Sequence, residues 1–233
     1  MNVALTPGAE GLDILGGHAA FLGLDSPLTH AVGIGVNGAV TAAAMDQLER
    51  FYSERDCPTV IEFCPLADPA LFDLLRDRRY RIVEFQNVLV ANLPPTPMAA
   101  PAHVRPAGQD EWISVVTRGF LGSENLPIEA HDIARPLAQY AARYVVDLEG
   151  EAAGGGAMWI TDEVAWMFAD GTRHAFRGRG VQTALIQRRL QDAVLTGAKF
   201  AFAATAPNSQ SQANYIRGGF RVLYTKLGMS NQA

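Results

Sequence analysis

The stretch VAWMFADGTRHAFRGRGVQTALIQRRL, residues 164–190, decides how the rest of the chain is interpreted. Residues 164–169 are apolar or aromatic, and a short run of this kind predicts a buried strand. The triplet Asp-Gly-Thr at 170–172 predicts the end of that strand. Apolar residues at helical spacing follow and predict an amphipathic helix. A short basic turn, Arg-Gly-Arg-Gly-Val-Gln at 177–182, joins the strand to the helix.

The turn at 177–182 has the properties of an anion-binding site. The first backbone N–H groups of a helix have no partner within the helix, and the helix dipole places partial positive charge there. Glycine lets the backbone approach a ligand closely because it has no Cβ. Further positive charge is expected from Arg173, His174, Arg177 and Arg179. The sequence therefore predicts a pyrophosphate or a similar ligand, and the alternative is a solvated turn.

The run RGRGVQTALI, which begins at Arg177, resembles the acyl-CoA-binding motif of the GNAT N-acetyltransferase superfamily. That motif reads Gln/Arg-x-x-Gly-x-Gly/Ala. Arg177 and Gly180 match it, whereas Gln182 stands where glycine or alanine is usual.

A second run, NSQSQANYIRGGF at residues 208–220, resembles the next motif of the same superfamily, Asn-x-x-Ala/Ser-x-x-x-Tyr-x-x-x-Gly-Phe. The matching positions are Asn208, Ser211, Tyr215, Gly219 and Phe220. The two motifs occur in the expected order, separated by one predicted helix and one predicted strand. Together the resemblance covers residues 102–230.

The resemblance implies an α+β fold in which one mixed sheet carries helices on both faces. It also implies acetyl-CoA as the acyl donor, with its pantetheine arm between two splayed strands that end near 170–172 and 200–205. Asn208 is expected to contact that arm, or else to cap the following helix. The residues implied to hold the donor are Gly171, Thr172, Arg177, Gly178, Arg179, Gly180, Val181, Gln182, Thr183, Asn208 and Ser211.

The implied reaction moves an acetyl group to a primary amine of a small molecule or peptide. Tyr215 is the candidate general acid for the departing thiolate, because a phenol pKa of ~10 lies close to that of a thiol. The alternative is that Tyr215 only packs its ring or hydrogen-bonds the sulfur. Asp170 is a candidate base or a turn-forming residue. Trp166 stands where some family members carry a glutamate base, which leaves the base open.

The acceptor is not specified by the sequence. Glu124, between two predicted helices, is a candidate partner for a cationic acceptor. The residues Trp112, Phe120, Trp159 and Trp166 are candidates for the acceptor pocket or for the core. Two other functions stay open: a non-catalytic acyl-CoA sensor on the same fold, and a structural module.

Four prolines within residues 94–101 predict a stiff linker, which divides the chain into residues 1–93 and 102–233. Shifting the chain by 140 residues superimposes similar predicted elements, so residues 1–93 are interpreted as a degenerate first copy of two tandem GNAT folds. In this superposition Asn37, Val40 and Leu75 align with Arg177, Gly180 and Tyr215, respectively. The first copy is therefore predicted not to bind the donor.

The elements can be predicted from periodicity and turn residues. In the first half, residues 1–16 look irregular, with strands predicted at 17–22, 28–36, 59–63 and 81–90 and helices at 41–55 and 68–78. In the second half, the predicted order is β-α-α-β-β-β-α-β-α-β, with early helices at 109–119 and 128–142. Pro136 is expected to kink or split the second of these. Glycines 154–156 predict a bulge or a tight strand.

The composition indicates which classes of protein and which partners are excluded. Hydrophobic residues make up 48% and charged residues 18% of the chain, which is typical of a globular protein. A pI near 5.5 argues against nucleic acid as the main partner. The histidines lack metal-ligand spacing, and Cys57 and Cys64 flank one predicted strand, so neither zinc nor a disulfide is expected. The chain is expected to be cytoplasmic and not membrane-bound, and a homodimer is left open.

Overall fold

The computed structural model describes residues 9–24, 26–97, 99–125 and 130–232, without the side chains of residues 130–133. The chain forms two compact units. The first runs up to Gln86 and takes in the residues from Tyr224 onward. The second runs from Asn87 to Leu223. Each unit is described separately.

In its described residues, the first unit contains four whole strands and parts of two longer ones. Its elements are β1 (Glu10–Ile14), β2 (Gly17–Phe21), β3 (His30–Val32), α1 (Ala42–Ser53), β4 (Val60–Phe63), α2 (Pro69–Asp77), the first part of β5 (Arg81–Asn92) and the last part of β11 (Arg221–Ser230). The strand order is β1-β2-β3-β4-β11. Only β3 and β4 pair in parallel; the other neighbours are antiparallel.

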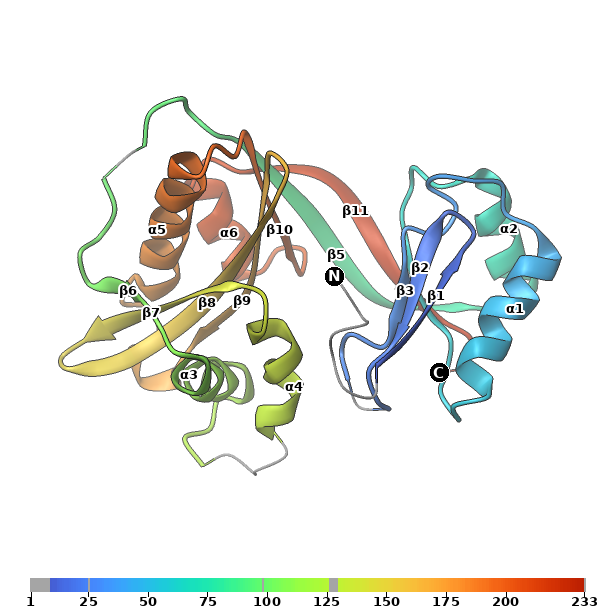
Figure 1. Ribbon diagram of the computed structural model, residues 1–233, viewed down its shortest axis with the longest axis horizontal. Coiled ribbons are helices and arrows are strands. Elements are labelled where there is room, and N and C mark those ends of the chain that lie inside the picture. Colours follow the sequence, from blue (N-terminus) through green and yellow to red (C-terminus); the bar gives the residue numbers. More distant parts are fainter. Residues whose placement is uncertain (1–8, 25, 98, 126–129, 233) are drawn as a thin grey trace. The chain divides into compact units, whose positions relative to one another are not determined.

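The core of the first unit lies between these strands and its two helices (Figure 1). Met45, Leu48 and Tyr52 of α1 are fully buried, and so are Leu71 and Leu75 of α2. The prediction for the start of α2 is confirmed: Asp68 caps the helix through a 3.0 Å bond from the N–H of residue 70, and a proline occupies its first turn. These apolar faces bury both helices against one sheet.

The expectation that residues 1–16 are irregular is wrong for β1, which pairs with β2 as an antiparallel hairpin. Leu15 and Gly16 form the two-residue turn, and both have positive φ angles of 53° and 72°. Hairpin turns of this kind favour Asn-Gly or Gly-Gly. Because the first turn position is a leucine, the sequence lacks the residue pair that would predict this hairpin turn.

The second unit contains the predicted order of elements. These are β6 (Val104–Pro106), α3 (Gln109–Leu121), α4 (Ala130–Ala138), β7 (Ala142–Leu148), β8 (Glu151–Thr161), β9 (Val164–Thr172), a short 3₁₀ turn (His174–Phe176), α5 (Val181–Leu195), β10 (Phe200–Thr205) and α6 (Gln210–Arg217). The strand order is β5-β10-β9-β8-β7-β6. Of the neighbouring pairs in this order, only β9 and β10 are parallel, so the predicted α+β class with a mixed sheet is confirmed.

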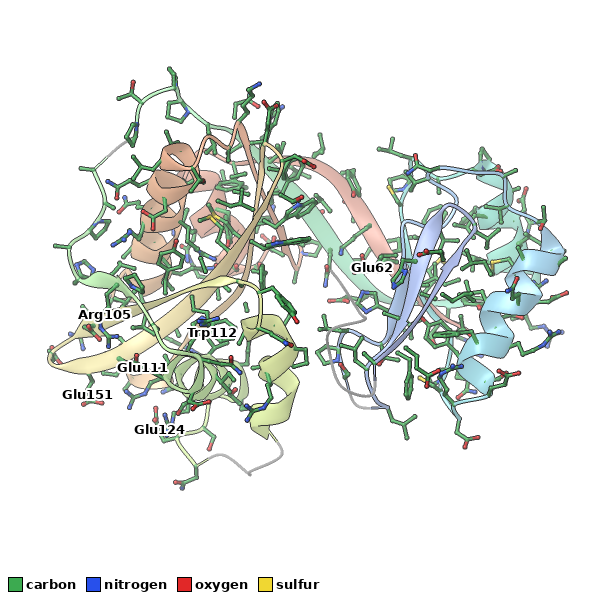
Figure 2. The ribbon with its side chains drawn as sticks, viewed as in Figure 1. Glu62, Arg105, Glu111, Trp112, Glu124 and Glu151 are labelled. Atoms are coloured by element: carbon green, nitrogen blue, oxygen red, sulfur yellow. The ribbon has the colours of Figure 1, made fainter. Side chains whose placement is uncertain are left out.

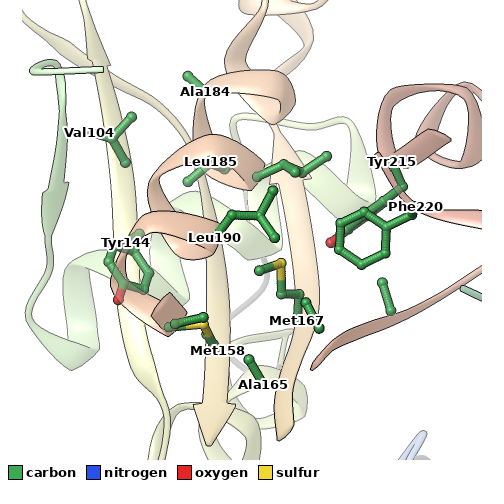
Figure 3. Packing of buried hydrophobic residues seen from close by; sticks show 14 of the residues in the cluster. Val104, Tyr144, Met158, Ala165, Met167, Ala184, Leu185, Leu190, Tyr215 and Phe220 are labelled. Atoms are coloured by element: carbon green, nitrogen blue, oxygen red, sulfur yellow. The ribbon is translucent and has the colours of Figure 1, made fainter. Parts of the chain in front are cut away.

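Helices cover both faces of the second unit's sheet (Figure 1). On one face, Leu185 and Leu190 of α5 pack with Met158 of β8 and Met167 of β9 (Figure 3). On the other face, α3 and α4 pack around Trp112, which is fully buried and donates from Nε1 to the carbonyl of Gly156 at 3.0 Å. Trp112 is therefore a core residue.

A cluster of ion pairs links β6 to α3 and β7. Arg105 lies 2.7 Å from Glu111 of α3 and 2.6 Å from Asp147 of β7 (Figure 2). The early helix predicted at 128–142 is α4, which ends at residue 138 and contains Pro136 within its described length. Residues 126–129 lie outside the described part of the chain.

Strand β9 is not broken after residue 169 as predicted; it continues through Asp170 and Gly171 to Thr172 and carries a bulge. The register against β8 shifts by one residue between the pairs Ala157–Phe168 and Gly155–Gly171. Ala169 has a φ of 56°, which is uncommon for a residue with a Cβ. The extra residue reverses the alternation of side chains, so that Asp170 rather than Ala169 faces α5. The predicted irregularity at glycines 154–156 is confirmed by the same shift.

The two parallel strands of the second unit part after a short pairing. Strands β9 and β10 pair from Val164–Phe200 to Met167–Ala203. Beyond that point β9 continues for five residues without pairing to β10. The opposite edge of β10 stays paired with β5 as far as the pair Thr205–Asn87. The predicted splay between these strands is confirmed.

Each unit takes its last strand from the other half of the sequence. Residues 87–92 of β5, which precede the predicted linker, pair with β10 of the second unit. Residues 227–230 of β11 pair with β4 of the first unit. The Pro-rich segment 94–101 lies within the second unit, so a boundary between autonomous domains at that segment stays a prediction.

Truncation tests the role of β5. A fragment of residues 102–233 lacks the strand that pairs with β10 and exposes an open edge, whereas a fragment of residues 87–233 keeps that strand. We expect the longer fragment to melt cooperatively and the shorter one to aggregate or melt without a sharp transition, measured by circular dichroism. Identical melting of both fragments would show that β5 is dispensable.

Candidate active site

The N-terminus of α5 presents backbone N–H groups instead of a side-chain cap. Gly180 is the N-cap residue, and among the described residues no side chain makes a capping hydrogen bond there. Gly178 and Gly180 have φ angles of 75° and 80°, and a Cβ on either would meet nothing within 4 Å. The positive φ, more than lack of space, is therefore the reason for glycine. The turn and the helix dipole together favour an anion.

This helix terminus opens on a cavity of about 670 Å³. The cavity lies between the end of β9, the glycine turn and one face of α6. Its lining consists of Gly119, Asp170, Thr172, Phe176, Arg177, Gly178, Gly180, Val181, Gln182, Thr183, Gln210, Ser211, Asn214 and Arg217. The structure thus brings two separated sequence motifs to one site.

Two arginines line the cavity. Arg177 donates to the carbonyls of Gly119 at 3.1 Å and Thr172 at 3.4 Å, which holds its guanidinium against the α3 and β9 backbones. Arg217 lies at the end of α6 and bonds to Asn214. Neither takes part in an ion pair among the described residues. Their charge is available to an anionic ligand.

Two of the other predicted cations, the arginines at 173 and 179, are bound to carboxylates. Arg173 lies 3.0 Å from both Glu124 and Glu151. Figure 2 labels these two glutamates. Arg179 lies 2.5 Å from Glu149 and is not part of the cavity lining. The structure therefore places Arg177, but neither Arg173 nor Arg179, at the cavity.

A buried ion pair stands behind the cavity wall. Asp170 Oδ1 lies 2.6 Å from Arg189 Nη2, and the two side chains are 9% and 0% exposed. The Tyr215 hydroxyl donates to Asp170 Oδ2 at 2.7 Å and accepts from Arg189 at 3.4 Å. Tyr215 packs edge-on against Phe220 (Figure 3). One carboxylate therefore links β9, α5 and α6.

Gln182 extends this network into the cavity, which explains its departure from the family motif. Its Nε2 donates to Asp170 at 3.0 Å and to Ser211 at 2.7 Å, and its Oε1 accepts from Asn214 at 2.6 Å. A glycine or alanine at this position would leave those groups without this partner. The glutamine joins the N-terminus of α5 to α6.

Burial keeps the proton on Tyr215. Loss of hydration raises the pKa of its phenol well above the ordinary value, against the lowering effect of the Arg189 charge, and the Asp170 carboxylate raises it further. Tyr215 is 2% exposed and does not line the cavity in this structure. At neutral pH it is a proton donor.

The triple glycine in β8 makes room for this arrangement. A Cβ at Gly156 would lie 2.6 Å from Asp170 Oδ1 and 3.1 Å from the Arg189 guanidinium. Gly171, predicted to hold the donor, is instead in close contact with α3, since its Cβ would lie 2.6 Å from the carbonyl of Val116. It is buried and does not line the cavity.

Several predicted residues lie away from the cavity. Asn208 has a φ of 57° and does not cap α6; Ser209 is the N-cap and accepts from the N–H of Gln212 at 3.1 Å. Trp166 is half exposed and stacks on Phe202 at a centroid distance of 5.0 Å. Glu124 is bound to Arg173, as described above. Their predicted functions stay predictions.

Sequence reasoning missed Arg189, which looks like a solvated residue in a basic helix. The signal was its spacing from Gln182, because residues seven apart lie on one face of a helix. Gln210, Asn214 and Arg217 also repeat at helical spacing on α6 and were missed. Thr205, at the splayed end of β10, is 6% exposed, and its hydroxyl has no hydrogen-bond partner among the described residues.

In the first unit, side chains cap the N-terminus of helix α1. Thr41 caps α1 by accepting from the N–H of Ala44 at 3.3 Å. Asp68 accepts from the N–H of Val40 at 3.1 Å, just before α1 begins. A carboxylate at this position occupies the place of an anion and repels another. Leu75 is fully buried in the core of this unit.

No described helix combines the length and apolar character needed to cross a bilayer. The described histidine, cysteine, aspartate and glutamate residues form no group of three that could hold a metal ion. Cys57 and Cys64 are free thiols.

Comparison with known families agrees with this geometry. Residues 111–220 match the model of the acetyltransferase (GNAT) family. The chain therefore carries a domain of the GNAT family, whose members transfer acyl groups. No curated protein matches the sequence significantly.

Solved structures share the fold at low identity. A GCN5-related N-acetyltransferase from Kribbella flavida superimposes with a TM-score of 0.71 at 17% identity, covering 96% of this chain and 90% of that one. A functionally unknown conserved protein from Staphylococcus epidermidis gives 0.65 at 9% identity, covering 97% and 95%. A tandem GNAT protein from the clavulanic acid biosynthesis pathway gives 0.61 at 13% identity, covering 93% and 79%.

Substitution of Gly156 tests the close packing behind the cavity. In Gly156→Ala the new methyl group would collide with the Asp170–Arg189 pair, and we expect a loss of about 1–3 kcal/mol in unfolding free energy by urea titration. Gly108→Ala is the matched control, because Gly108 has an ordinary φ and no atom within 4 Å of its Cβ position. Equal stability of the two variants would contradict the packing argument.

Proposed function

We propose that the protein is an N-acetyltransferase that moves acetyl from acetyl-CoA to a primary amine of a small molecule or peptide. The observation that carries this proposal is the uncapped N-terminus of α5, which opens on the cavity beside the parted ends of β9 and β10. The family match supports acyl transfer in general. The donor and the kind of acceptor are the proposal.

The residues present fit such a donor. The N–H groups of Val181, Gln182 and Thr183 would hold the pyrophosphate, with the charge of Arg177 beside them. The unpaired backbone edges of the splayed strands offer hydrogen bonds to the amides of a pantetheine arm. Thr205 adds a buried hydroxyl that has no partner among the described residues. Arg217 supplies a second cation at the cavity.

The transfer needs one proton to move from nitrogen to sulfur. The amine nitrogen forms a bond to the thioester carbonyl carbon, and the carbon–sulfur bond breaks. The nitrogen gives up a proton and the departing thiolate takes one up. We assign the second step to Tyr215, which stays protonated at neutral pH and lies directly behind Asp170. Positioning of the two reactants supplies most of the remaining acceleration.

Asp170 fits a positioning role better than that of a base. Its carboxylate is buried and is already engaged by Arg189, Tyr215 and Gln182. The amine then either binds already deprotonated or gives its proton to a water molecule. Glu124 and Trp166 stay candidates for contacts with the acceptor.

The first unit is proposed to be a degenerate tandem copy that does not bind the donor. Its elements follow the order of the second unit from β7 to β11. The Thr41 and Asp68 side chains close the terminus of α1. The fold likeness to a tandem GNAT protein supports the same interpretation.

Isothermal titration with acetyl-CoA tests both parts of this proposal. We expect one site per chain, and two sites would refute the proposal for the first unit. Gly180→Ala should weaken binding about tenfold, because a Cβ at positive φ disturbs the N–H groups of the turn. Gly197→Ala is the control, since Gly197 also has positive φ and free space but lies at the other end of α5.

Replacement of the proposed acid tests the chemistry. Tyr215→Phe removes the donor hydroxyl but keeps the ring against Phe220, so kcat should fall at least tenfold with the KM for acetyl-CoA unchanged. The measurement is thiol release with a reactive amine. A loss smaller than about threefold would mean that Tyr215 only packs.

A thiol-release screen decides the activity itself. The wild-type protein is assayed with acetyl-CoA against simple amines, amino acids, polyamines and aminoglycosides. Turnover with any of them supports transfer. Donor binding without thiol release would identify a sensor, and a protein whose melting temperature does not change with CoA would be a structural module.

A further inference from the structure

The cavity beside α5 carries two positive centres on different walls. One is the N-terminus of α5, where backbone N–H groups, the helix dipole and Arg177 come together. The other is Arg217, in the last turn of α6. Asp170 is the only carboxylate among the described residues that line the cavity, and it is paired with Arg189. The cavity wall is therefore positive overall, although the chain has a formal net charge of -5.

A chain of hydrogen bonds connects Arg217 to the first turn of α5. Gln210, Asn214 and Arg217 are spaced so that they follow one another along one side of α6, and all three line the cavity. The Asn214 side-chain oxygen accepts from Gln210 at 3.0 Å and from Arg217. Its amide nitrogen donates to Gln182 of α5 at 2.6 Å. Arg217 thus belongs to the polar wall that α5 and α6 share.

Most of the hydrogen-bonding capacity of Arg217 is unused. A guanidinium group has five N–H donors in a planar fork. The bond to Asn214 takes one nitrogen of Arg217, and no carboxylate of the described residues pairs with it. A cation in the last turn also stabilises its helix through the dipole, but that role does not require it to line a cavity. The free part of the fork fits a phosphate group, which accepts two parallel hydrogen bonds.

Two separate positive centres suit a ligand with two separate anionic groups. Coenzyme A has a diphosphate and, on the 3′ position of its ribose, a phosphate monoester. Several N–H groups converge at the start of α5, which fits the diphosphate. Arg217 offers a single fork on a different wall, which fits the monoester. The cavity volume of about 670 Å³ is in the range of cofactor sites.

We propose that Arg217 binds the 3′-phosphate of coenzyme A (CoA) and makes the site selective for donors that carry this group. Dephospho-CoA has the same diphosphate and pantetheine arm but a 3′-hydroxyl, so it is the weaker ligand. This inference rests on the proposed function, because it takes an acyl-CoA as the donor. Its test measures binding and needs no turnover.

Isothermal titration of the full-length protein compares CoA with dephospho-CoA. The measurements are made at about 0.15 M salt, where exposed charges more than about 8 Å apart are largely screened. We expect the wild type to bind CoA at least about fivefold more tightly than dephospho-CoA. Arg217→Gln should raise the Kd for CoA at least about fivefold and change that for dephospho-CoA less than about twofold. The ratio of the two changes isolates the contact, as in a double-mutant cycle.

Arg221→Gln is the matched control. Arg221 begins β11, is also exposed, and does not line the cavity. The same charge is lost, so the Kd values for both ligands should change equally and by less than about twofold. Arg177→Gln is the second control, since Arg177 lies at the place assigned to the diphosphate. It should weaken CoA and dephospho-CoA by the same factor, and loss of the preference for CoA in this variant would contradict the assignment of the monoester to Arg217.

Three results overturn the inference. The first is a wild type that binds both ligands equally, and the second is an Arg217→Gln variant that keeps the wild-type preference. The third is an equal loss for both ligands in Arg217→Gln, which would place Arg217 against the diphosphate. If Arg217→Gln does not melt cooperatively, Arg217→Lys decides, because it keeps the charge and loses the fork. A reduced preference for CoA in Arg217→Lys supports the inference, and an unchanged preference overturns it.

The two proposals fail in different ways. If neither CoA nor dephospho-CoA binds to the wild type, both fail. If the two ligands bind equally and the protein releases thiol with an amine, the proposed function stands and only the inference about Arg217 fails. If CoA is preferred through Arg217 but no amine leads to thiol release, the protein is a sensor and the inference about Arg217 stands.

Discussion

The second unit depends on one buried ion pair, between Asp170 on β9 and Arg189 on α5. Isolated charges are costly to bury, so each of these side chains is tolerated only because the other is present. The bulge at Ala169 and the glycine at 156 are local departures from regular sheet geometry that the pair requires. Local irregularity and buried charge therefore have one cause, and they lie directly behind the cavity wall.

The exchange of last strands gives the chain a second constraint. Strand β10 is completed by residues that precede the Pro-rich segment, and β4 is completed by the last residues of β11. A central strand needs hydrogen-bonding partners on both edges. Each unit thus requires both halves of the sequence, even though its helices and most of its strands come from one half.

The two units differ in how one of their helices begins. Helices α1 and α5 both begin after a parallel strand of their unit. In α5, glycines at positive φ leave the first N–H groups of the helix free. At the start of α1, backbone N–H groups instead donate to the side chains of Thr41 and Asp68. The carboxylate and the hydroxyl at the start of α1 thus accept from backbone N–H groups of the kind that remain free at the start of α5.

By itself, the sequence determined the order of elements and the position of the site. The strand of residues 164–169, the glycine turn and the helix after it are local features, set by periodicity and by residues whose φ preferences are strong. The helix starts at Asp68 and after residue 208 were equally local. These signals need only neighbouring residues, so a linear pattern shows them.

Only the tertiary structure decided how those elements meet. Asp170 faces α5 and pairs with Arg189, and Arg173 and Arg179 form ion pairs with glutamates. Strands β5 and β11 each pair with a strand from the other half of the sequence. All of these contacts join residues that are far apart in the chain. A side chain's partner depends on strand register and helix rotation, and one extra residue in β9 reverses which side chain faces the helix. No spacing in the sequence carries that information.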